Sequence, residues 1–428
     1  MLDPRVFRDA EAFAAARAAL ARRGASAERE ALLERLRVLA ERRRAAIATA
    51  EQVKAELNAA STDVGRLKKQ GGDAAAVQAR AKELSSRAQT LDADARTIAA
   101  AFDAALLELP NVPAPDVAAG GPEANTVVRE QGKPLETAER KPHWELGARL
   151  GILDLERGAK LAGSGFPLYV GLGARLERAL INYLLDLQTR EHEYTEVSPP
   201  FVANRASLTG TGQLPKFEDD LYRITDNLFL IPTAEVPVTN LHRDEILDGA
   251  SLPKRYAAYT PCWRREAGAA GADTRGILRV HQFDKIELVW FTAPEASEAA
   301  HDGLTRHAEA ALQRLGLAYR VVKVAAGDMG FGGARQYDLE TWAPGVGKWL
   351  EVSSCSTYTD FQARRMNIRF RRQAGAKPEF VHTLNGSALG LARTLIAILE
   401  TYQQPDGTVR VPDVLVPLVG TEVIGPGA

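Results

Sequence analysis

The stretch YTPCWRREAGAAGADTRGILRVHQFDKIELVWF, residues 259–291, decides the fold that we expect for this chain. Apolar, β-branched and aromatic residues begin and end it, and a loop rich in Gly and Ala lies between them. This pattern predicts a strand, a long loop and an antiparallel return strand. Because side chains alternate along a strand, His281, Phe283, Lys285 and Glu287 should share one face. A ring there can stack on a base and a carboxylate can bind an amine or hydroxyl, although Phe283 alone is more typical of a core.

Arginines bracket the predicted loop: Arg264 and Arg265 precede it, and Arg275 and Arg279 follow. A guanidinium matches phosphate oxygens with a planar fork of donors, so these residues form a candidate polyphosphate clamp. A solvated hairpin with surface salt bridges would have the same composition, and charge alone favours that alternative.

Length and composition restrict the class of protein. A chain of 428 residues is long enough for two or three domains, and a net charge of -1 means that any nucleic-acid surface must be local. Cys262 and Cys355 are the only cysteines, which suits a reducing cytoplasm and excludes a Cys-rich zinc site. No apolar run approaches ~20 residues and no signal-peptide core opens the chain, so we expect no membrane span.

A heptad pattern dominates the N-terminal quarter. Apolar residues and alanines recur at alternating spacings of four and three over residues 32–67, where Arg43 is the only polar member, and again over residues 77–109. The sequence QGGD at 70–73 separates them, so we predict an antiparallel pair of helices, the first about 60 Å long. So thin a rod suits an arm that reaches a partner, although its mixed charges alone favour an ordinary solvated coiled coil.

Several segments connect these regions. Residues 110–142 are rich in Pro, Gly and Ala and read as a linker. Residues 171–193 predict an amphipathic helix, and the strand-like YTEVSPPFV after it carries a Pro199–Pro200 pair that suits only an edge or an interface. We expect a flexible loop at 209–217 and another amphipathic helix at 294–316.

Three further motifs contain chemistry-bearing residues. Thr233 and Glu235 follow a short apolar strand, where they could bind an ammonium group or, as the residues alone favour, cap a helix. The Gly-rich run GDMGFGG is a turn or a loop that brings Asp328 near the site. Glu351 and Ser354 are hard oxygen ligands of the kind that Mg2+ shares with phosphates, and exposed polarity at a strand end is an equal alternative.

The last motif is HTLNGSALGLARTLIAILETYQ, residues 382–403. Its small residues should open an apolar helix and let the backbone approach a ligand. Arg393 near the start of that helix opposes the helix dipole, which an anionic ligand would offset. A buried helix with one N-terminal Arg is the plain alternative.

The chain resembles the class II aminoacyl-tRNA synthetases. The run from Arg264 to Glu287 is similar to their second signature motif, and REAG, DTRG and HQFDK resemble the seryl-tRNA synthetase version. Residues 171–200 resemble the first motif, which builds a dimer interface, and residues 382–403 resemble the third. The resemblance covers essentially the whole chain, arm included.

This resemblance implies an α+β fold, in which an antiparallel sheet flanked by helices follows an N-terminal helical hairpin. The expected domains are a tRNA-binding arm at 1–109, a linker at 110–142 and a catalytic domain at 143–428. The implied protein is a cytoplasmic homodimer that activates serine with ATP and Mg2+ and transfers it to the 3′ end of tRNA(Ser), with tRNA(Sec) as a further candidate.

Site residues follow from the same resemblance. Arg264 and Arg393 are expected to be catalytic, and Glu351 and Ser354 to bind the metal. The expected serine ligands are Thr233, Ala234, Glu235, Arg264, Glu287, Asn385 and Ser387. The expected ATP ligands are Arg264, Arg265, Glu266, Val280, Phe283, Glu351, Val352, Ser353, Ser354 and Arg393.

The chain departs from the family pattern at a few positions. Members commonly have Ser at Arg265, Arg at Ala272, Asn-Cys at Thr357-Tyr358 and Gly at Ala392. None of these changes removes an expected ligand, although Ala272 puts contacts of the loop with the tRNA acceptor end in doubt.

Two other functions stay open at this point. A homologue that loads an amino acid onto a carrier protein would lack the long arm, which this chain has. A non-catalytic coiled-coil scaffold should have lost Arg264, Glu351 or Arg393, and all three are present.

Overall fold

The computed structural model describes residues 1–137, 140–267 and 274–426, which separate into two compact units. The N-terminal unit contains Met1–Ala21 and Ala25–Pro110, and the C-terminal unit contains Arg22–Gly24 and Asn111–Ala428. No helix in the described ranges combines the length and the apolar character that a membrane span requires.

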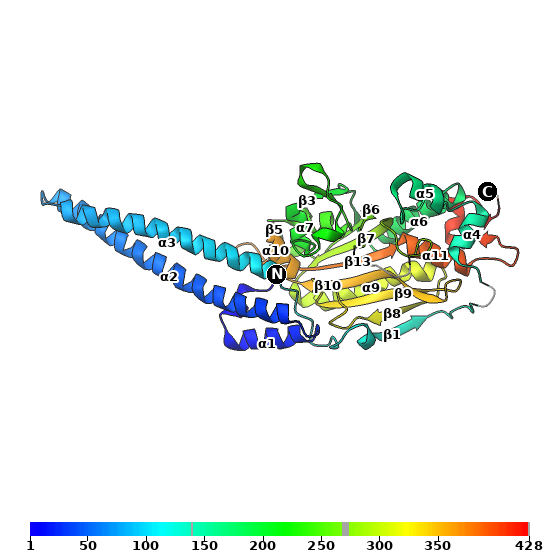
Figure 1. The fold of residues 1–428 in the computed structure, drawn as a ribbon, viewed down its shortest axis with the longest axis horizontal. Coiled ribbons are helices and arrows are strands. Elements are labelled where there is room, and N and C mark those ends of the chain that lie inside the picture. Colours follow the sequence, from blue (N-terminus) through cyan, green and yellow to red (C-terminus); the bar gives the residue numbers. More distant parts are fainter. Residues whose placement is uncertain (138–139, 268–273, 427–428) are drawn as a thin grey trace. The chain divides into compact units, whose positions relative to one another are not determined.

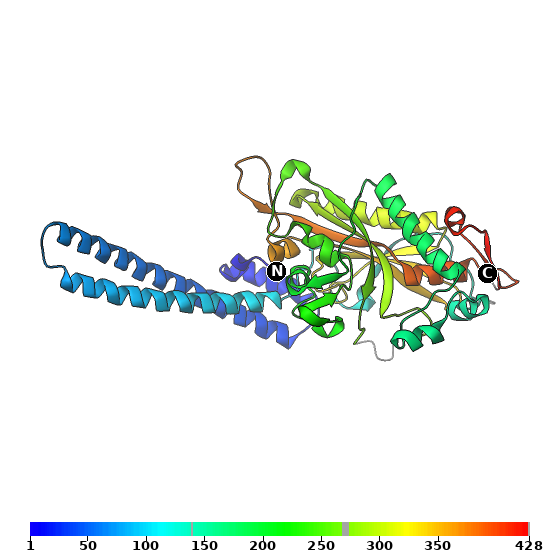
Figure 2. The same cartoon turned by 90° about the horizontal axis from the view of Figure 1, so that it is seen from above.

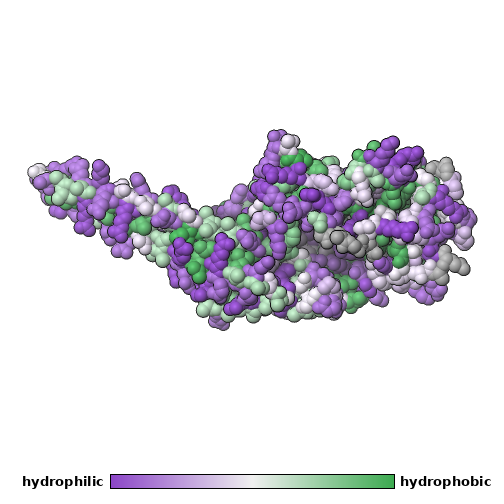
Figure 3. Space-filling view, viewed as in Figure 1, coloured by the Kyte–Doolittle hydropathy of each residue, from purple (hydrophilic) through white to green (hydrophobic). Residues whose placement is uncertain are grey.

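The N-terminal unit confirms the predicted helical hairpin. Helices α2 (Ala27–Lys69) and α3 (Ala75–Leu107) run antiparallel beside each other, after the short α1 (Ala10–Ala21) (Figures 1 and 2). The predicted seam positions Val53, Ala60, Leu84 and Ala88 form its buried core. Hydrophilic residues cover most of the face of the hairpin that Figure 3 shows. Alanines in the seam let the two backbones approach closely, so this thin rod needs no third helix.

The C-terminal unit contains both helices and strands, and its first strand lies before residue 143, where the catalytic domain was expected to begin. Its helices are α4 (His143–Leu150), α5 (Leu155–Ala162), α6 (Leu172–Asp186), α7 (Arg205–Thr211), α8 (Glu235–Thr239), α9 (Ser297–Arg314), α10 (Phe361–Met366), α11 (Leu391–Thr401) and α12 (Val416–Val419). The strands of the main sheet are β1 (Thr126–Gln131), β2 (Thr195–Glu196), β6 (Lys254–Trp263), β7 (Gln282–Thr292), β8 (Tyr319–Lys323), β9 (Arg335–Ala343), β10 (Lys348–Thr359) and β13 (His382–Gly390). Short pairings elsewhere use β3 (Val202–Asn204), β4 (Leu228–Leu230), β5 (Ile246–Asp248), β11 (Arg369–Arg371), β12 (Glu379–Phe380), β14 (Val409–Arg410) and β15 (Val423–Ile424).

The main sheet has the order β1-β8-β9-β10-β13-β7-β6-β2 within the described residues. Every neighbouring pair is antiparallel except β2 with β6. Strands β6 and β7 are the predicted strand and return strand, and they pair from Lys254 with Phe291 to Trp263 with Gln282. This confirms the expected antiparallel sheet.

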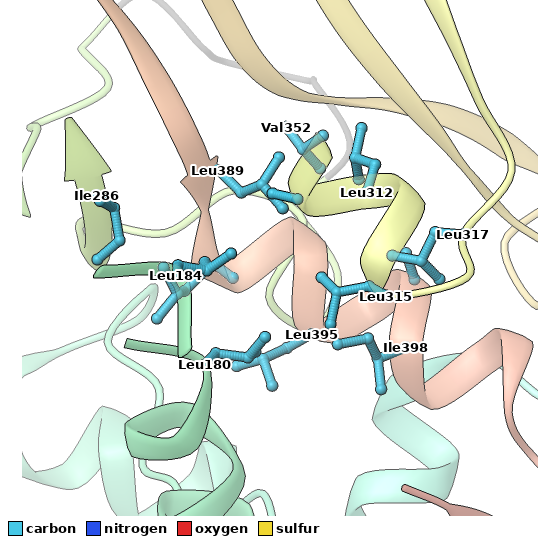
Figure 4. Packing of buried hydrophobic residues seen from close by; sticks show 14 of the residues in the cluster. Leu180, Leu184, Ile286, Leu312, Leu315, Leu317, Val352, Leu389, Leu395 and Ile398 are labelled. Atoms are coloured by element: carbon cyan, nitrogen blue, oxygen red, sulfur yellow. The ribbon is translucent and has the colours of Figure 1, made fainter. Parts of the chain in front are cut away.

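Helices cover the sheet unequally, and this leaves room for a site. Helix α9 packs on one face, where His301 Nε2 donates to the Cys355 carbonyl at 2.9 Å and Leu304 lies close to Gly386. Apolar side chains of α11, such as Leu395 and Ile398, lie among those of α6 and the end of α9 (Figure 4). These contacts hold the start of α11 beside the ends of β10 and β13.

Three segments differ from the sequence-based expectation. The run HTLNGSALG, which was expected to open a helix, is the central strand β13, and the helix begins only at Leu391. The predicted linker contains β1, which pairs with β8 at the sheet edge. The expected loop at 209–217 starts inside α7. In each case pairing or packing with distant residues decides the structure over local composition.

The chain passes between the two units at Arg22–Gly24 and at Asn111, and hydrogen bonds hold both of these crossings in the C-terminal unit. The Asn111 side chain donates to the carbonyls of Gly332 and Tyr358, both at 2.9 Å. The Arg23 guanidinium donates to the carbonyls of Asn111, at 2.9 Å, and Gly333, at 2.6 Å. Residues far apart in the sequence are therefore tied to the same turn before β9.

Candidate functional site

A cavity of about 470 Å³ lies in the C-terminal unit, on the face of the sheet opposite α9. Its wall comes from the residues before α8, from β7, β10 and β13, and from the first turn of α11. The predicted site residues that line it are Thr233, Glu235, Arg264, Glu266, Val280, Phe283, Glu287, Glu351, Val352, Ser353, Ser354, Asn385, Ser387 and Arg393. The fold thus brings together most of the residues that the sequence singled out.

A buried ion pair occupies one end of the cavity. Lys285 Nζ lies 2.5 Å from Glu287 Oε2 and donates to Thr233 Oγ1 at 2.8 Å. The Thr233 hydroxyl donates to Glu287 Oε2 at 3.3 Å, and Ser387 faces Glu287 across the β13–β7 pairing. Both charged side chains are almost fully buried, at 9% and 2% exposure. The carboxylate is therefore oriented by the protein before a ligand arrives.

A second carboxyl group, that of Glu235, lies close to this ion pair. Burial, followed by the charge of Glu287, raises the pKa of Glu235 to about 7. Gln362 Nε2 donates to Glu235 Oε1 at 2.6 Å. Nearby, the buried Asn385 amide nitrogen has no hydrogen-bond partner of good geometry among the described residues, although Tyr358 donates to the amide oxygen at 3.3 Å. Acceptors and an unused donor that converge in this way can bind a small polar molecule with an ammonium group.

The neighbouring region of the cavity suits a base and phosphates. The Arg264 guanidinium lies 5.1 Å from the centre of the Phe283 ring, and its Nε donates to the Pro232 carbonyl at 3.3 Å. Arg279 is paired with Glu266 at 2.6 Å. A flat aromatic surface with a guanidinium on it matches a nucleotide, whose base stacks and whose phosphates accept from Arg.

Arg393 occupies the far side of the cavity, in the first turn of α11. Its Nε donates to the Leu278 carbonyl at 3.2 Å, and Nη1 donates to the Glu351 carbonyl at 2.8 Å. The Glu351 carboxylate is 3.9 Å from Nη1 and nearly half exposed. Backbone carbonyls thus aim the guanidinium while part of its charge stays available to an anion.

The Glu351 region offers oxygen ligands to a cation. Ser354 lies in the same wall, and burial together with the charge of Glu351 raises the pKa of the adjacent Asp338 to about 8. Among the described residues no cluster of three or more His, Cys, Asp or Glu side chains could hold a metal alone. One carboxylate and one hydroxyl beside an arginine that suits phosphates nevertheless fit Mg2+, which usually keeps waters and shares substrate phosphates.

Comparisons with known proteins agree with this geometry. A family model described as "tRNA synthetase class II core domain (G, H, P, S and T)" matches residues 216–402, and "Seryl-tRNA synthetase N-terminal domain" matches residues 1–113. The serine–tRNA ligase of Gemmatimonas aurantiaca is 56% identical over 388 residues, which are 90% of this chain and 91% of that relative. The chain belongs to the serine–tRNA ligase family.

Other members of the serine–tRNA ligase family are similar over the same extent. The Geobacter sulfurreducens enzyme is 54% identical over 390 residues, 90% of this chain and 92% of the relative. The crystal structure of seryl-tRNA synthetase from Pyrococcus horikoshii complexed with ATP matches with a TM-score of 0.94 and 36% identity, covering 100% of both chains. The serine–tRNA ligase of Naegleria fowleri, in complex with AMP, matches with a TM-score of 0.88 and 29% identity, covering 100% of this chain and 99% of that one.

Some residues that the family pattern suggested lie away from the cavity wall. Arg265 and Ala234 do not line the cavity, and Ala234 is fully buried before α8. Arg275 lies over the Trp144 ring, 4.6 Å from its centre, so the expected clamp of four arginines reduces to Arg264 and Arg279. Asp328 accepts from Asn125 at 2.7 Å and is absent from the wall.

The departures from the family pattern fall in different places. Ala272 lies outside the described residues. Tyr358 and Ala392 line the cavity, while Thr357 is buried and bonds with Ser297 at 3.2 Å. Sequence reasoning did not select Lys285, Gln336 or Tyr358 as site residues. For Lys285 a signal existed, since it shares a strand face with Phe283 and Glu287.

Proposed function

We propose that this chain joins serine to the 3′ end of tRNA(Ser) in two steps with ATP. The observation that carries the proposal is a single cavity in which a buried set of acceptors, Thr233, Glu235 and Glu287, adjoins the arginines Arg264 and Arg393. The acceptor set suits the ammonium and hydroxyl groups of serine, and the arginines suit a carboxylate and phosphates. Family membership supports the same activity.

In the first step, a serine carboxylate oxygen attacks the α-phosphorus of ATP in line. A bond forms between them, the bond to the bridging oxygen breaks, and pyrophosphate leaves with the electron pair. No protein nucleophile is needed, so positioning and neutralisation of charge should provide most of the rate. Arg264 would contact the α-phosphate and the serine carboxylate, and Arg393 the outer phosphates.

In the second step, a terminal ribose hydroxyl of the tRNA attacks the acyl carbon of seryl-adenylate. An ester forms, the mixed anhydride breaks, and AMP leaves. Glu266, Val280 and Phe283 would hold the adenosine during both steps, with Phe283 stacked on the base. Asn385 and Ser387 would complete the serine pocket beside Glu287.

Glu351 and Ser354 would hold Mg2+ together with the phosphates of ATP. The ion would neutralise the negative charge of the phosphates. The side chains of Arg264 and Arg393 supply the remaining positive charge from the protein.

The partner and the assembly belong to the same proposal. Residues 1–109 would bind tRNA, with tRNA(Sec) as a second candidate, residues 110–142 would link this arm to the rest, and residues 143–428 would catalyse the reaction. A homodimer in the cytoplasm is the expected form, with α6 and the Pro199–Pro200 region at the interface. The hydrophilic, narrow hairpin supports a role outside the catalytic cavity.

The test is serine-dependent exchange of pyrophosphate into ATP, followed by charging of total tRNA in the same tube. We expect exchange and then stable seryl-tRNA. Exchange without charging would assign the adenylate to a carrier protein, and no exchange with any amino acid would favour the scaffold.

A further inference from the structure

A buried pair of side chains, His143 at the start of α4 and Glu400 near the end of α11, lies behind the cavity wall. Both are fully buried, and His143 Nδ1 is 2.9 Å from Glu400 Oε1. The His143 backbone N–H donates to the same oxygen, while Oε2 accepts from the backbone N–H groups of Gly345, at 2.8 Å, and Val346, at 3.0 Å. The carboxylate is therefore satisfied from several sides and holds the imidazole in one orientation.

The other ring nitrogen of His143 holds the segment that returns toward β7. Ile277 donates its backbone N–H to His143 Nε2 at 3.0 Å. A nitrogen that accepts in this way carries no proton, so the ring is neutral and its Nδ1–H donates to Glu400. Gly276 has φ +68°, and a Cβ on it would lie 2.1 Å from Nε2, so this close approach requires glycine.

A second contact acts on the same segment. The Arg275 guanidinium lies 4.6 Å from the centre of the ring of Trp144, the residue next to His143. The first two residues of α4 therefore hold residues 275–277 through one hydrogen bond and one cation–π contact.

Residues 275–277 lead directly into the cavity wall, so their position affects the cavity. Ile277 and Leu278 line the cavity, and the Leu278 carbonyl accepts from Arg393 Nε at 3.2 Å. Arg393 and Glu400 belong to the same helix, α11. The contacts close a ring that runs from Glu400 through His143, Ile277 and Leu278 to Arg393 and back along the helix.

We propose that His143 is a positioning residue that sets the place of Arg393 through the backbone of Ile277 and Leu278. It touches no substrate itself. Its role rests on the proposed function, in which Arg393 binds the outer phosphates of ATP. Loss of the bond at Nε2 should therefore weaken the use of ATP and leave the use of serine unchanged.

Two substitutions at His143 separate its two hydrogen bonds. The side-chain amide of His143→Gln reaches the place of Nε2 and can accept from Ile277, whereas that of His143→Asn reaches only the place of Nδ1 and can donate to Glu400. In pyrophosphate exchange we expect His143→Asn to raise the KM for ATP by about tenfold, and His143→Gln by about threefold or less. The KM for serine should change by less than about twofold in both.

A third variant changes the other partner of the contact, residues 275–277, and leaves His143 in place. Gly276→Ala should displace the contact with His143 and raise the KM for ATP by about tenfold. The variant should also melt at a lower temperature than the parent, because its added Cβ is strained at a positive φ and crowds a buried ring, so its KM is measured well below that temperature. It decides the question if both His143 variants fail to fold. His307 is a part-buried histidine whose Nδ1 is 3.0 Å from the Tyr194 hydroxyl. The variant His307→Gln is the control and should leave both KM values unchanged.

Equal effects of His143→Asn and His143→Gln on the KM for ATP, or an unchanged KM in Gly276→Ala, would overturn the positioning role. A parent protein without serine-dependent exchange would instead refute the proposed function. In that case calorimetric binding of ATP to the same variants gives the test, with the same order of affinities expected.

Discussion

Glu287 meets its partners before any substrate binds, because Lys285 and Thr233 both contact its carboxylate. A buried acceptor arranged for a hydroxyl penalises an amino acid that lacks one, since the acceptor then stays unpaired. We expect Glu287→Ala to lower kcat/KM for serine by at least about hundredfold while calorimetric binding of ATP survives. Glu298→Ala, which removes an exposed carboxylate, is the matched control. Retained serine activation in Glu287→Ala would contradict the assignment.

Glu235 makes the use of serine depend on pH. Its pKa is raised to about 7, first by burial and then by Glu287, so below that pH the ligand-free protein holds this carboxyl neutral. The ammonium of serine needs the ionised form, so we expect the KM for serine to fall as pH rises from about 6 to 8. The KM for ATP serves as the internal reference, and Glu235→Gln should flatten the serine profile.

The sign for stability is opposite to that for substrate. A carboxyl whose pKa is raised by folding binds its proton more tightly in the folded state. Its stabilising contribution is therefore present at acidic pH and is lost as pH rises through about 7. The free energy of unfolding without serine should decrease between about pH 4.5, the ordinary pKa of a Glu side chain, and about pH 7, and level off above pH 7. An equal decrease in Glu235→Gln would count against Glu235 as its source.

Residue by residue, sequence reasoning reached side chains but not their partners. Strand alternation placed Lys285 beside Glu287 on one face, yet an ion pair between them depends on Thr233 and on the burial supplied by other strands. At Thr233 the structure shows a contact of the capping kind, because its hydroxyl accepts from the Glu235 N–H at 3.2 Å at the start of α8. The hydroxyl also contacts the ion pair, and binding of a ligand's ammonium group stays a prediction.

At the scale of elements, the close packing of α9 on the sheet depends on Gly386, a glycine of β13. A Cβ on Gly386 would lie 2.6 Å from Leu304 and 2.7 Å from the Cys355 sulfur. We expect Gly386→Ala to lower the free energy of unfolding by about 1–3 kcal/mol, because the packed interface cannot take another methyl group. Urea denaturation measures this change.

The opposite side of the same interface supplies a control. In the part of the chain that the structure describes, a Cβ on Gly303 of α9 would meet only the Trp290 ring, at 3.5 Å. Gly303→Ala should be neutral or stabilise by about 0.5–1 kcal/mol, since alanine favours a helix. Equal decreases in the free energy of unfolding of the two variants would show that general crowding is responsible, and not the close packing at Gly386.

Elements with a long regular period were predictable, and those decided by distant partners were not. The heptads over 32–67 and 77–109 correspond to α2 and α3. By contrast, the small residues of β13 show no alternation, because the side chains on both faces of this strand, which lies between β10 and β7 in the sheet, are buried. Strand β1 lies in a Pro-rich and Gly-rich segment and forms only because β8 offers an open edge.

For the whole molecule, the hairpin and the cavity should serve different steps. Lys54 on α2 and Asp92 on α3 pair at 2.8 Å, so they mark the same level of the two helices. Replacing residues 55–91 by a short Gly and Ser turn therefore shortens the rod without changing its register. We expect pyrophosphate exchange to persist and kcat/KM for tRNA charging to fall by about hundredfold, because phosphate contacts are lost.

A variant that keeps the full length of the hairpin checks that the shortened hairpin loses activity because of its length. Gly65→Ala should leave both reactions unchanged, because no atom of the described residues lies within 4 Å of an added Cβ apart from the immediate chain. Charging that survives shortening would assign tRNA binding to the other unit.

The fastening of Asn111 and Arg23 has a mechanical consequence. The polypeptide enters and leaves the hairpin at two crossings, and the Arg23 guanidinium binds the Asn111 carbonyl, so the crossings are tied to each other as well as to the turn at 331–333. Tension on the hairpin would therefore load both crossings together, because neither crossing can detach without breaking the contact between Arg23 and Asn111. The load passes to the backbone of Tyr358, whose side chain lines the cavity.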